Sequence, residues 1–389
     1  MGPALPRKSG SGADAVPNAS APAFPSRLPA LTGIRFWLAL GVVLFHYQLN
    51  MVPEGGTGIA LIERARLAVD FFFILSGFIL AHVYGRQVRS GTYNHKRFLI
   101  ARLARIYPAH LAMMVVMAII VLVAIALGQP FANDSYSLPG FLSALFLTHA
   151  WFPATVPNEW NGPSWSLSAE WAAYLAFPVF AYIGLKAGRR PWVTIALSVG
   201  LFLLIDGVYR WVFKDQLTHA ELVLGVLRII PEFLFGIGLY QLGSRIRCGR
   251  RTATLAAIGS LAALLCLMAI SADERLIVAM SGAVILGLAL WDRAEDDSVF
   301  NHPLLLEAGE ASYALYLVHL PLLIIWKNGM AMLGGIDSTY RMSASEAALL
   351  LALTVACAFA LHAFWERPAR ALIRSLFLTP SPKPERGQS

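Results

Sequence analysis

Charged residues are scarce in this chain. They make up 14% of its 389 residues, whereas soluble globular domains carry about 25%. Cysteine is also rare, and the three cysteines are Cys248, Cys266 and Cys357. Their spacing predicts neither a disulfide framework nor a metal site. No apolar segment precedes Leu31, so we expect no cleavable signal peptide. These absences exclude an ordinary soluble enzyme and a disulfide-rich secreted domain.

Long apolar runs dominate the sequence instead. Hydrophobic residues make up 57% of the chain, and several runs reach the roughly 20 residues that a helix needs to cross a bilayer. We therefore predict an all-α, polytopic protein of the cytoplasmic (inner) membrane. Its bundle of about ten transmembrane helices is expected near residues 31–50, 66–85, 106–127, 165–184, 191–208, 222–243, 253–271, 275–291, 311–328 and 345–365.

Both ends of the chain depart from this pattern. Residues 1–27 are rich in Pro, Ala, Ser and Gly, and residues 375–389 are polar and rich in proline. Such segments cannot bury enough apolar surface to fold. We predict two disordered tails, 1–27 and 375–389, around one transmembrane domain at 28–374.

Basic residues are distributed unevenly among the predicted loops. If both termini are cytoplasmic and the short apolar stretch 138–149 does not cross, the cytoplasmic loops hold the clusters at 86–105, 186–190, 245–251 and 367–374. That arrangement follows the positive-inside rule. If 138–149 crossed, the later clusters would lie outside. The net charge of +8 therefore reflects membrane topology, and we expect no nucleic-acid partner.

Two ionisable residues, Arg35 and His46, lie inside the first apolar run. Their spacing places them on nearly the same face of a helix, roughly 16 Å apart along its axis. Ionisable groups are costly within a membrane and often mark functional sites. With the topology above, Arg35 lies near the cytoplasmic surface and His46 near the outer one. The pair predicts a polar track that runs into the membrane.

Two carboxylates are expected at the depth of His46. Asp70 and Glu170 lie near the outer ends of their predicted helices, which places all three groups roughly 5–10 Å below the outer surface. An imidazole can remove a proton from a hydroxyl, and a carboxylate can orient it and stabilise its charged form. We therefore predict His46, Asp70 and Glu170 as catalytic residues. The alternative is that each caps a helix or contacts interfacial water.

A second candidate site is cytoplasmic. Arg102 and Arg105 are i, i+3 neighbours on a helix and can form a two-pronged anion site. A basic cluster at the mouth of a polar track suits a phosphorylated donor such as a coenzyme A thioester, whose long arm could carry an acyl group toward His46. Alternatively, these arginines only hold the loop inside. His319 is predicted near mid-membrane, where it needs a hydrogen-bond partner.

Together these motifs resemble those of the acyltransferase 3 family, the membrane-bound acyltransferases that modify bacterial surface and exported carbohydrates. The similar segments occur in family order across about residues 28–372. They are 31–35 with His46, 69–78, 102–108, 165–170, 312–321 and 366–368. The resemblance implies a ten-helix core that transfers an acyl group, commonly acetyl, from cytoplasmic acyl-CoA to a sugar hydroxyl. It also implies that Arg35 and His46 fill the essential motif of the first helix.

The sequence thus predicts a membrane O-acyltransferase with no permanently bound cofactor or metal. Acyl-CoA, expected to be acetyl-CoA, is the co-substrate, and Arg35, Arg102 and Arg105 would bind its phosphates. The acceptor would be a saccharide or lipid-linked glycan at the outer face. Whether His46 is a general base or is itself acylated stays open. The alternative function is a transporter or flippase of a polar or lipid-linked solute, although the repeats and broken helix pairs of transporters are not evident.

Overall fold

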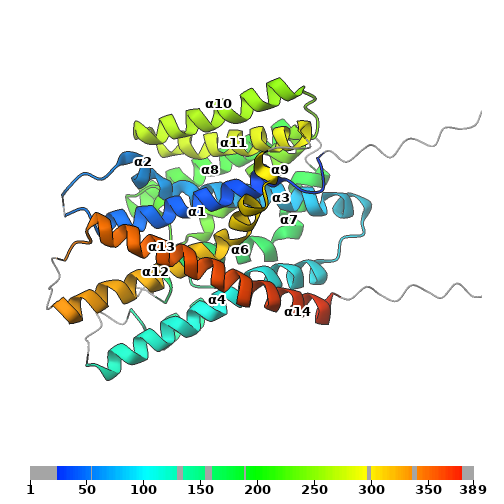
Figure 1. The fold of residues 1–389 in the computed structure, drawn as a ribbon. Coiled ribbons are helices and arrows are strands. Elements are labelled where there is room, and N and C mark those ends of the chain that lie inside the picture. Colours follow the sequence, from blue (N-terminus) through cyan, green and yellow to red (C-terminus); the bar gives the residue numbers. More distant parts are fainter. Residues whose placement is uncertain are drawn as a thin grey trace, which may run out of the picture.

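The computed structural model describes residues 24–53, 55–128, 135–153, 160–187, 190–295, 299–334 and 340–378. Within these ranges the chain forms helices and no strand (Figure 1). The α-helices are α1 (Pro29–Leu49), α2 (Ala60–Glu63), α3 (Ala68–Ser90), α4 (His95–Ala126), α5 (Leu138–Leu145), α6 (Trp165–Leu175), α7 (Phe177–Ala181), α8 (Pro191–Phe213), α9 (Val226–Gly243), α10 (Arg250–Ala269), α11 (Glu274–Ala294), α12 (Pro303–Gly334), α13 (Ala344–Leu361) and α14 (Arg367–Phe377). Shorter 3₁₀ or π segments are η1 (Arg64–Leu67), η2 (Gly162–Ser164), η3 (Tyr182–Ala187), η4 (Leu217–His219), η5 (Val299–Asn301) and η6 (His362–Glu366).

The predicted all-α membrane bundle is confirmed. Nine helices in the described ranges are long and apolar enough to cross a membrane, namely α1, α3, α4 and α8 to α13. The remaining predicted span, near 165–184, is divided into α6, α7 and η3. Pro178 is the second residue of α7, and its missing N–H interrupts the helical hydrogen bonds. The start of α1 and the end of α14 lie at the same end of the bundle (Figure 1), as an even number of crossings requires.

Local sequence signals begin and end several of these helices. The Asn94 side chain accepts a hydrogen bond from the backbone N–H of Arg97 at the start of α4, and Ser343 with Glu346 forms a capping box at the start of α13. Helix α3 ends at Gly91, whose φ of 74° is left-handed. Since α4 begins at His95, it extends well before its apolar run.

The predicted domain begins at residue 28, but packed structure begins earlier in the chain. Phe24 is 1% exposed, and its ring contacts those of Phe78 and Tyr240. At the other end, α14 continues through Phe377, and Pro368 is tolerated because it lies in the first turn of that helix. Phe24 therefore packs against the domain ahead of its predicted start, whereas α14 continues past 374 as an exposed helix. The predicted disorder of 1–23 and 379–389 lies outside the described residues.

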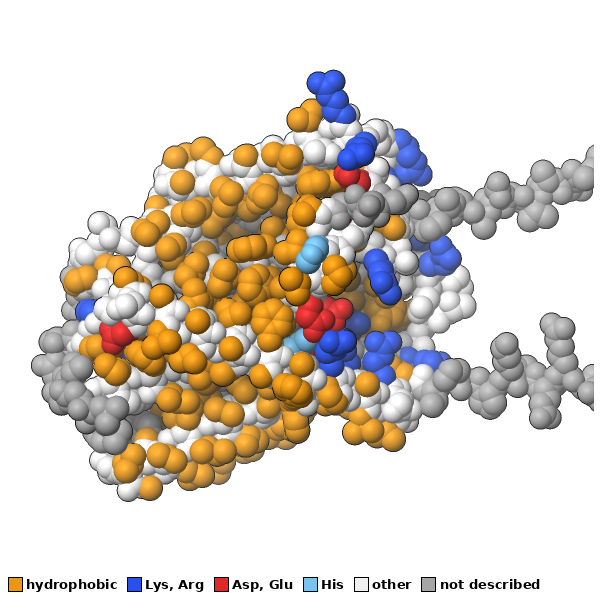
Figure 2. Space-filling view, in the orientation of Figure 1, with side chains coloured by type: hydrophobic (Ala, Val, Ile, Leu, Met, Phe, Trp, Pro, Cys, Tyr) orange, Lys and Arg blue, Asp and Glu red, His pale blue; other side chains and the backbone are white. Residues whose placement is uncertain are grey.

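The surface of the bundle is largely apolar. Exposed side chains include Val115, Ile119 and Leu122 of α4, and Leu203 and Leu204 of α8. Figure 2 shows hydrophobic side chains over most of the visible face and lysine and arginine side chains gathered toward the end where α14 terminates. Apolar side chains facing outward fit a lipid environment. The short α5, at about 12 Å long, cannot cross it.

Glycine residues allow α3 and α9 to pack closely. A Cβ atom on Gly77 of α3 would lie 2.0 Å from the carbonyl oxygen of Phe233, and one on Gly236 of α9 would lie 2.0 Å from that of Ile74. Both distances would be severe overlaps with backbone atoms. Small residues serve this purpose at many membrane helix interfaces, because they let the backbones approach.

We expect Gly236→Ala to destabilise the protein by about 1–3 kcal/mol, because the added methyl group must push α3 and α9 apart. The measurement is the unfolding temperature of the purified protein in detergent. Gly200→Ala in α8 is the matched control, since nothing lies within 4 Å of a Cβ there, and it should be neutral or stabilising. Equal unfolding temperatures for the two variants would contradict the close approach.

Candidate active site

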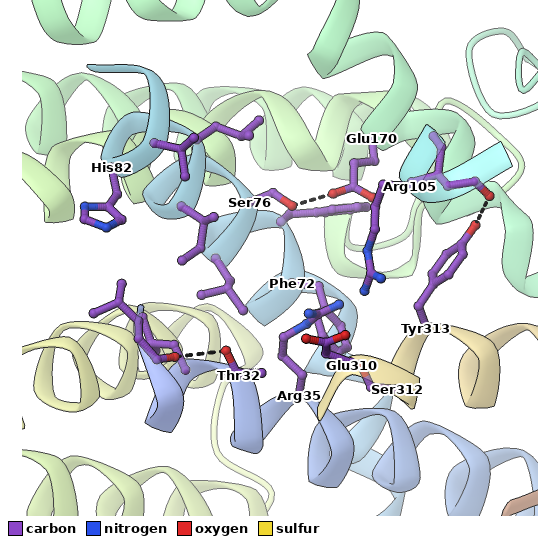
Figure 3. A pocket seen from close by; sticks show the side chains of 18 of the residues that line it. Thr32, Arg35, Phe72, Ser76, His82, Arg105, Glu170, Glu310, Ser312 and Tyr313 are labelled. Carbon is purple, nitrogen blue, oxygen red and sulfur yellow. Dashed lines mark hydrogen bonds between the residues drawn. The ribbon is translucent and has the colours of Figure 1, made fainter. Parts of the chain in front are cut away.

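A cavity of about 950 Å³ lies among α1, α3, α4, α6 and α12. This volume is at the upper end of the range typical for small-molecule sites. Four of the predicted site residues line it: Arg35, Arg102, Arg105 and Glu170. In Figure 3, Arg35, Arg105 and Glu170 extend toward a common space. The structure therefore brings together residues from three helices that are distant in sequence.

Arg35 and Arg102 are available to bind an anion. Among the described residues, neither forms an ion pair, and Nε of Arg102 is buried without a hydrogen-bond partner. The Arg102 guanidinium lies 6.0 Å from the centre of the Tyr84 ring. Both arginines are half-buried, and a cation partly removed from water without a partner is costly. An anionic ligand in the cavity would remove that cost.

Arg105 differs because it is already paired. Its Nη1 donates to Oε1 of Glu366 at 2.6 Å, and its guanidinium lies 5.7 Å from the centre of the Tyr313 ring. Glu366 is fully buried and also lies 2.9 Å from Nδ1 of His362. The sequence contained Glu366 as part of the 366–368 motif, but nothing there indicated that it orients Arg105. The pairing reduces the positive charge that Arg105 adds to the cavity.

Glu170 lies with the arginines and not with His46. Its carboxylate accepts hydrogen bonds from the hydroxyl groups of Ser76 and Tyr174, and the Ser76 contact is drawn in Figure 3. All three residues line the cavity. Glu170 can therefore orient polar groups of a ligand in the cavity. The described part of the structure has no hydrogen bond between Glu170 and His46.

Asp70 is bound to an arginine on another helix. Its Oδ2 lies 2.6 Å from Nη2 of Arg228 in α9, and its Oδ1 lies 3.3 Å from Nε of the same residue. Asp70 is 0% exposed and Arg228 is 2% exposed. The Arg228 guanidinium also lies 4.9 Å from the centre of the Trp165 ring. The expected pairing of Asp70 with His46 is therefore not found: counting residues predicts depth in the membrane, but Asp70 faces α9.

The partner of His46 is a second histidine. Nδ1 of His46 lies 3.2 Å from Nε2 of His319 in α12 and 2.9 Å from the carbonyl oxygen of Val42. His319 is fully buried, and its Nδ1 lies 2.7 Å from the carbonyl oxygen of Tyr316. Tyr316 also lines the cavity, so the cavity and the histidine pair meet at this residue. The predicted need of His319 for a hydrogen-bond partner is met by His46 and Tyr316.

Comparison with known proteins agrees with the family resemblance that the sequence motifs indicated. The sequence model of one protein family, described as an acyltransferase domain, matches residues 28–363. The acyltransferase MdmB of Streptomyces mycarofaciens is 28% identical over 380 residues, which cover 89% of this chain and 92% of that protein. Protein 2 in the picA locus of Rhizobium radiobacter is 31% identical over 188 residues, 46% of this chain and 95% of that protein.

A third relative is longer than this chain. The peptidoglycan O-acetyltransferase OatA of Listeria monocytogenes is 21% identical over 322 residues, which cover 77% of this chain and 50% of OatA. The chain thus spans about half of that protein. No solved structure matches the chain.

Proposed function

Because the chain belongs to the acyltransferase 3 family and is a membrane acyltransferase, we propose that it moves an acetyl group from cytoplasmic acetyl-CoA to a hydroxyl of a surface or exported saccharide. The observation that supports this donor is the cavity, where Arg35 and Arg102 form no ion pair with any residue in the described ranges. Coenzyme A carries three phosphate groups, and arginine binds phosphate through strong, charge-assisted hydrogen bonds. The proposed location is the cytoplasmic membrane, with the basic end of the bundle facing the cytoplasm.

The shape of the cavity supports a donor that enters from that end. Its lining includes residues 25–29 and Glu310, near the starts of α1 and α12, and also Ser166 and Tyr316 deeper in the bundle. Phe72 and Phe73 form part of its apolar wall. The phosphates would bind to the arginines, and the pantetheine arm would extend along the wall toward Tyr316 and the histidine pair.

In the proposed reaction His46 acts as the general base. The acceptor O–H bond breaks, its proton moves to His46, and the oxygen forms a bond with the acyl carbonyl carbon. The C–S bond of the thioester then breaks, and the departing sulfur takes the proton from His46. The histidine is regenerated, and the products are an ester and free coenzyme A.

The acceptor is proposed from the names of relatives. OatA is named a peptidoglycan O-acetyltransferase, and a Staphylococcus aureus relative is named a putative O-acetyltransferase. These names favour a saccharide hydroxyl and an acetyl group. The transporter alternative is not favoured, because the family and the relatives named by activity are acyltransferases.

Two measurements test the proposal. Purified protein in lipid nanodiscs should release coenzyme A from labelled acetyl-CoA when a saccharide acceptor is present. Mass spectrometry of surface polysaccharide and lipid-linked sugars from cells with and without the gene should show one acetyl mass missing in its absence. Solute movement across vesicles without thioester turnover would contradict the proposal.

We expect Arg102→Ala to raise KM for acetyl-CoA about 10-fold to 100-fold, because each lost hydrogen bond to a charged group costs about 1.5–3 kcal/mol. The effect on kcat should be smaller, since Arg102 contacts the donor away from the reacting carbonyl. Arg86→Gln is the matched control: it removes an exposed arginine near the end of α3 that does not line the cavity. An unchanged KM for Arg102→Ala would remove this residue from the donor site.

A further inference from the structure

The two histidines that contact each other, His46 and His319, each also contact a backbone carbonyl oxygen. Helices α1 and α12 pack together, and the two imidazole ring centres lie 4.9 Å apart. His46 is half-buried, whereas His319 is fully buried. Each ring nitrogen Nδ1 also contacts a backbone carbonyl oxygen: that of Val42 for His46 and that of Tyr316 for His319. These contacts determine where the protons of the pair lie.

A carbonyl oxygen can only accept a hydrogen bond. Nδ1 of His319 must therefore carry the proton that it donates to Tyr316, and in the neutral ring Nε2 of His319 is an acceptor. Nδ1 of His46 faces two acceptors, the Val42 carbonyl and Nε2 of His319, at 2.9 and 3.2 Å. It must carry a proton as well. Nε2 of His46 is then the nitrogen with a free lone pair, which is the tautomer that a general base requires.

We propose that His319 is the positioning residue of His46: it accepts a hydrogen bond from Nδ1–H of His46, holds His46 in the tautomer whose Nε2 is basic, and stabilises the imidazolium formed when Nε2 takes the acceptor's proton. This inference rests on the proposed acyl transfer. The proton moves from the acceptor hydroxyl to Nε2 of His46 and then to the departing sulfur, while Nδ1–H remains bonded to His319. A neutral imidazole thus takes the role that a carboxylate has in many catalytic triads.

The surroundings explain why an imidazole fills this role. An ionised carboxylate without a cationic partner is costly inside a membrane, whereas a neutral imidazole is not charged. Asp70 is already bound to Arg228, and Glu170 to Ser76 and Tyr174. Glu221 is a carboxylate whose charge reaches His46, but it is exposed, where solvent screens its effect.

Two polar substitutions test the two ring nitrogens of His319 separately. In His319→Gln, the side-chain amide oxygen can reach the place of Nε2 and still accept from His46. In His319→Asn, the shorter amide can keep the hydrogen bond to Tyr316 but has no acceptor near His46. We expect kcat for acetyl transfer to fall about 10²-fold to 10⁴-fold in His319→Asn, as when the residue that orients a catalytic histidine is altered. In His319→Gln we expect a clearly smaller loss, and KM for acetyl-CoA should be unchanged in both.

His110→Asn is the matched control for loss of a buried histidine. His110 is fully buried and contacts the carbonyl oxygen of Ala144 through Nε2, at 3.0 Å, so kcat per folded molecule should not change. Wild-type kcat in His319→Asn, or equal losses in the Asn and Gln variants, would overturn the positioning role. Wild-type protein that transfers no acetyl group would instead contradict the proposed function itself, so the two failures can be told apart.

Discussion

His46→Ala is expected to lower kcat for acetyl transfer about 10²-fold to 10⁴-fold, which is the usual contribution of a general base. The unfolding temperature and the Kd for acetyl-CoA should stay close to those of the wild-type protein. The reason is spatial: the arginines line the cavity on α1 and α4, whereas His46 lies in the last turn of α1 beside His319. Donor binding and proton removal therefore depend on different residues.

The kcat for acetyl transfer and the Kd for acetyl-CoA can be measured with one preparation. Turnover of labelled acetyl-CoA in nanodiscs reports kcat, and equilibrium binding of the same ligand reports Kd. His302→Ala is the matched control, because His302 is exposed and does not line the cavity. Acetyl transfer at the wild-type rate in His46→Ala would remove His46 from the reaction.

Asp70→Asn is expected to destabilise the protein by about 3–5 kcal/mol, because it removes the carboxylate that the buried Arg228 guanidinium contacts directly. The pair joins α3 to α9 through contacts of 2.6 and 3.3 Å and lies almost entirely out of solvent. Thermal unfolding in detergent measures the loss. Activity per folded molecule should be retained, since Asp70 contacts Arg228 rather than His46.

A second substitution tests whether loss of the Asp70–Arg228 contact causes that destabilisation. Asp70→Asn combined with Arg228→Gln removes both charges, so it should be more stable than Asp70→Asn alone, and the double-mutant cycle gives the coupling. Arg250→Gln is the control for an exposed pair. Arg250 contacts Glu295 at 2.6 Å, but its side chain is 71% exposed, and such pairs contribute about 0–1 kcal/mol. Loss of kcat without loss of stability in Asp70→Asn would instead favour the catalytic role predicted from depth.

Much of the fold follows from the sequence because hydropathy is a local property. Apolar runs predicted the positions of the spans, although α4 begins at His95 because its basic first turns extend beyond the apolar run. The short run that forms α5 was predicted not to cross, and it is too short to do so. The grouping of arginines could also be predicted in part, since Arg102 and Arg105 are neighbours on one helix.

Side-chain partners could not be predicted in the same way. Asp70 and Arg228 are 158 positions apart, Arg105 and Glu366 are 261 apart, and His46 and His319 are 273 apart. Counting along a helix gives the depth of a residue but not the direction in which its side chain points relative to other helices. Asp70 and Glu170 were therefore assigned to the level of His46, while the structure directs them to Arg228 and to the cavity.

The sequence by itself determined the class of the protein, the approximate spans and the polar residues placed within them, because each depends on neighbours in the chain. Only the tertiary structure decided which of those residues meet. Close packing of α3 against α9 through Gly77 and Gly236, and of α1 against α12, sets the rotation of each helix about its own axis. That rotation places an imidazole, rather than a carboxylate, beside His46.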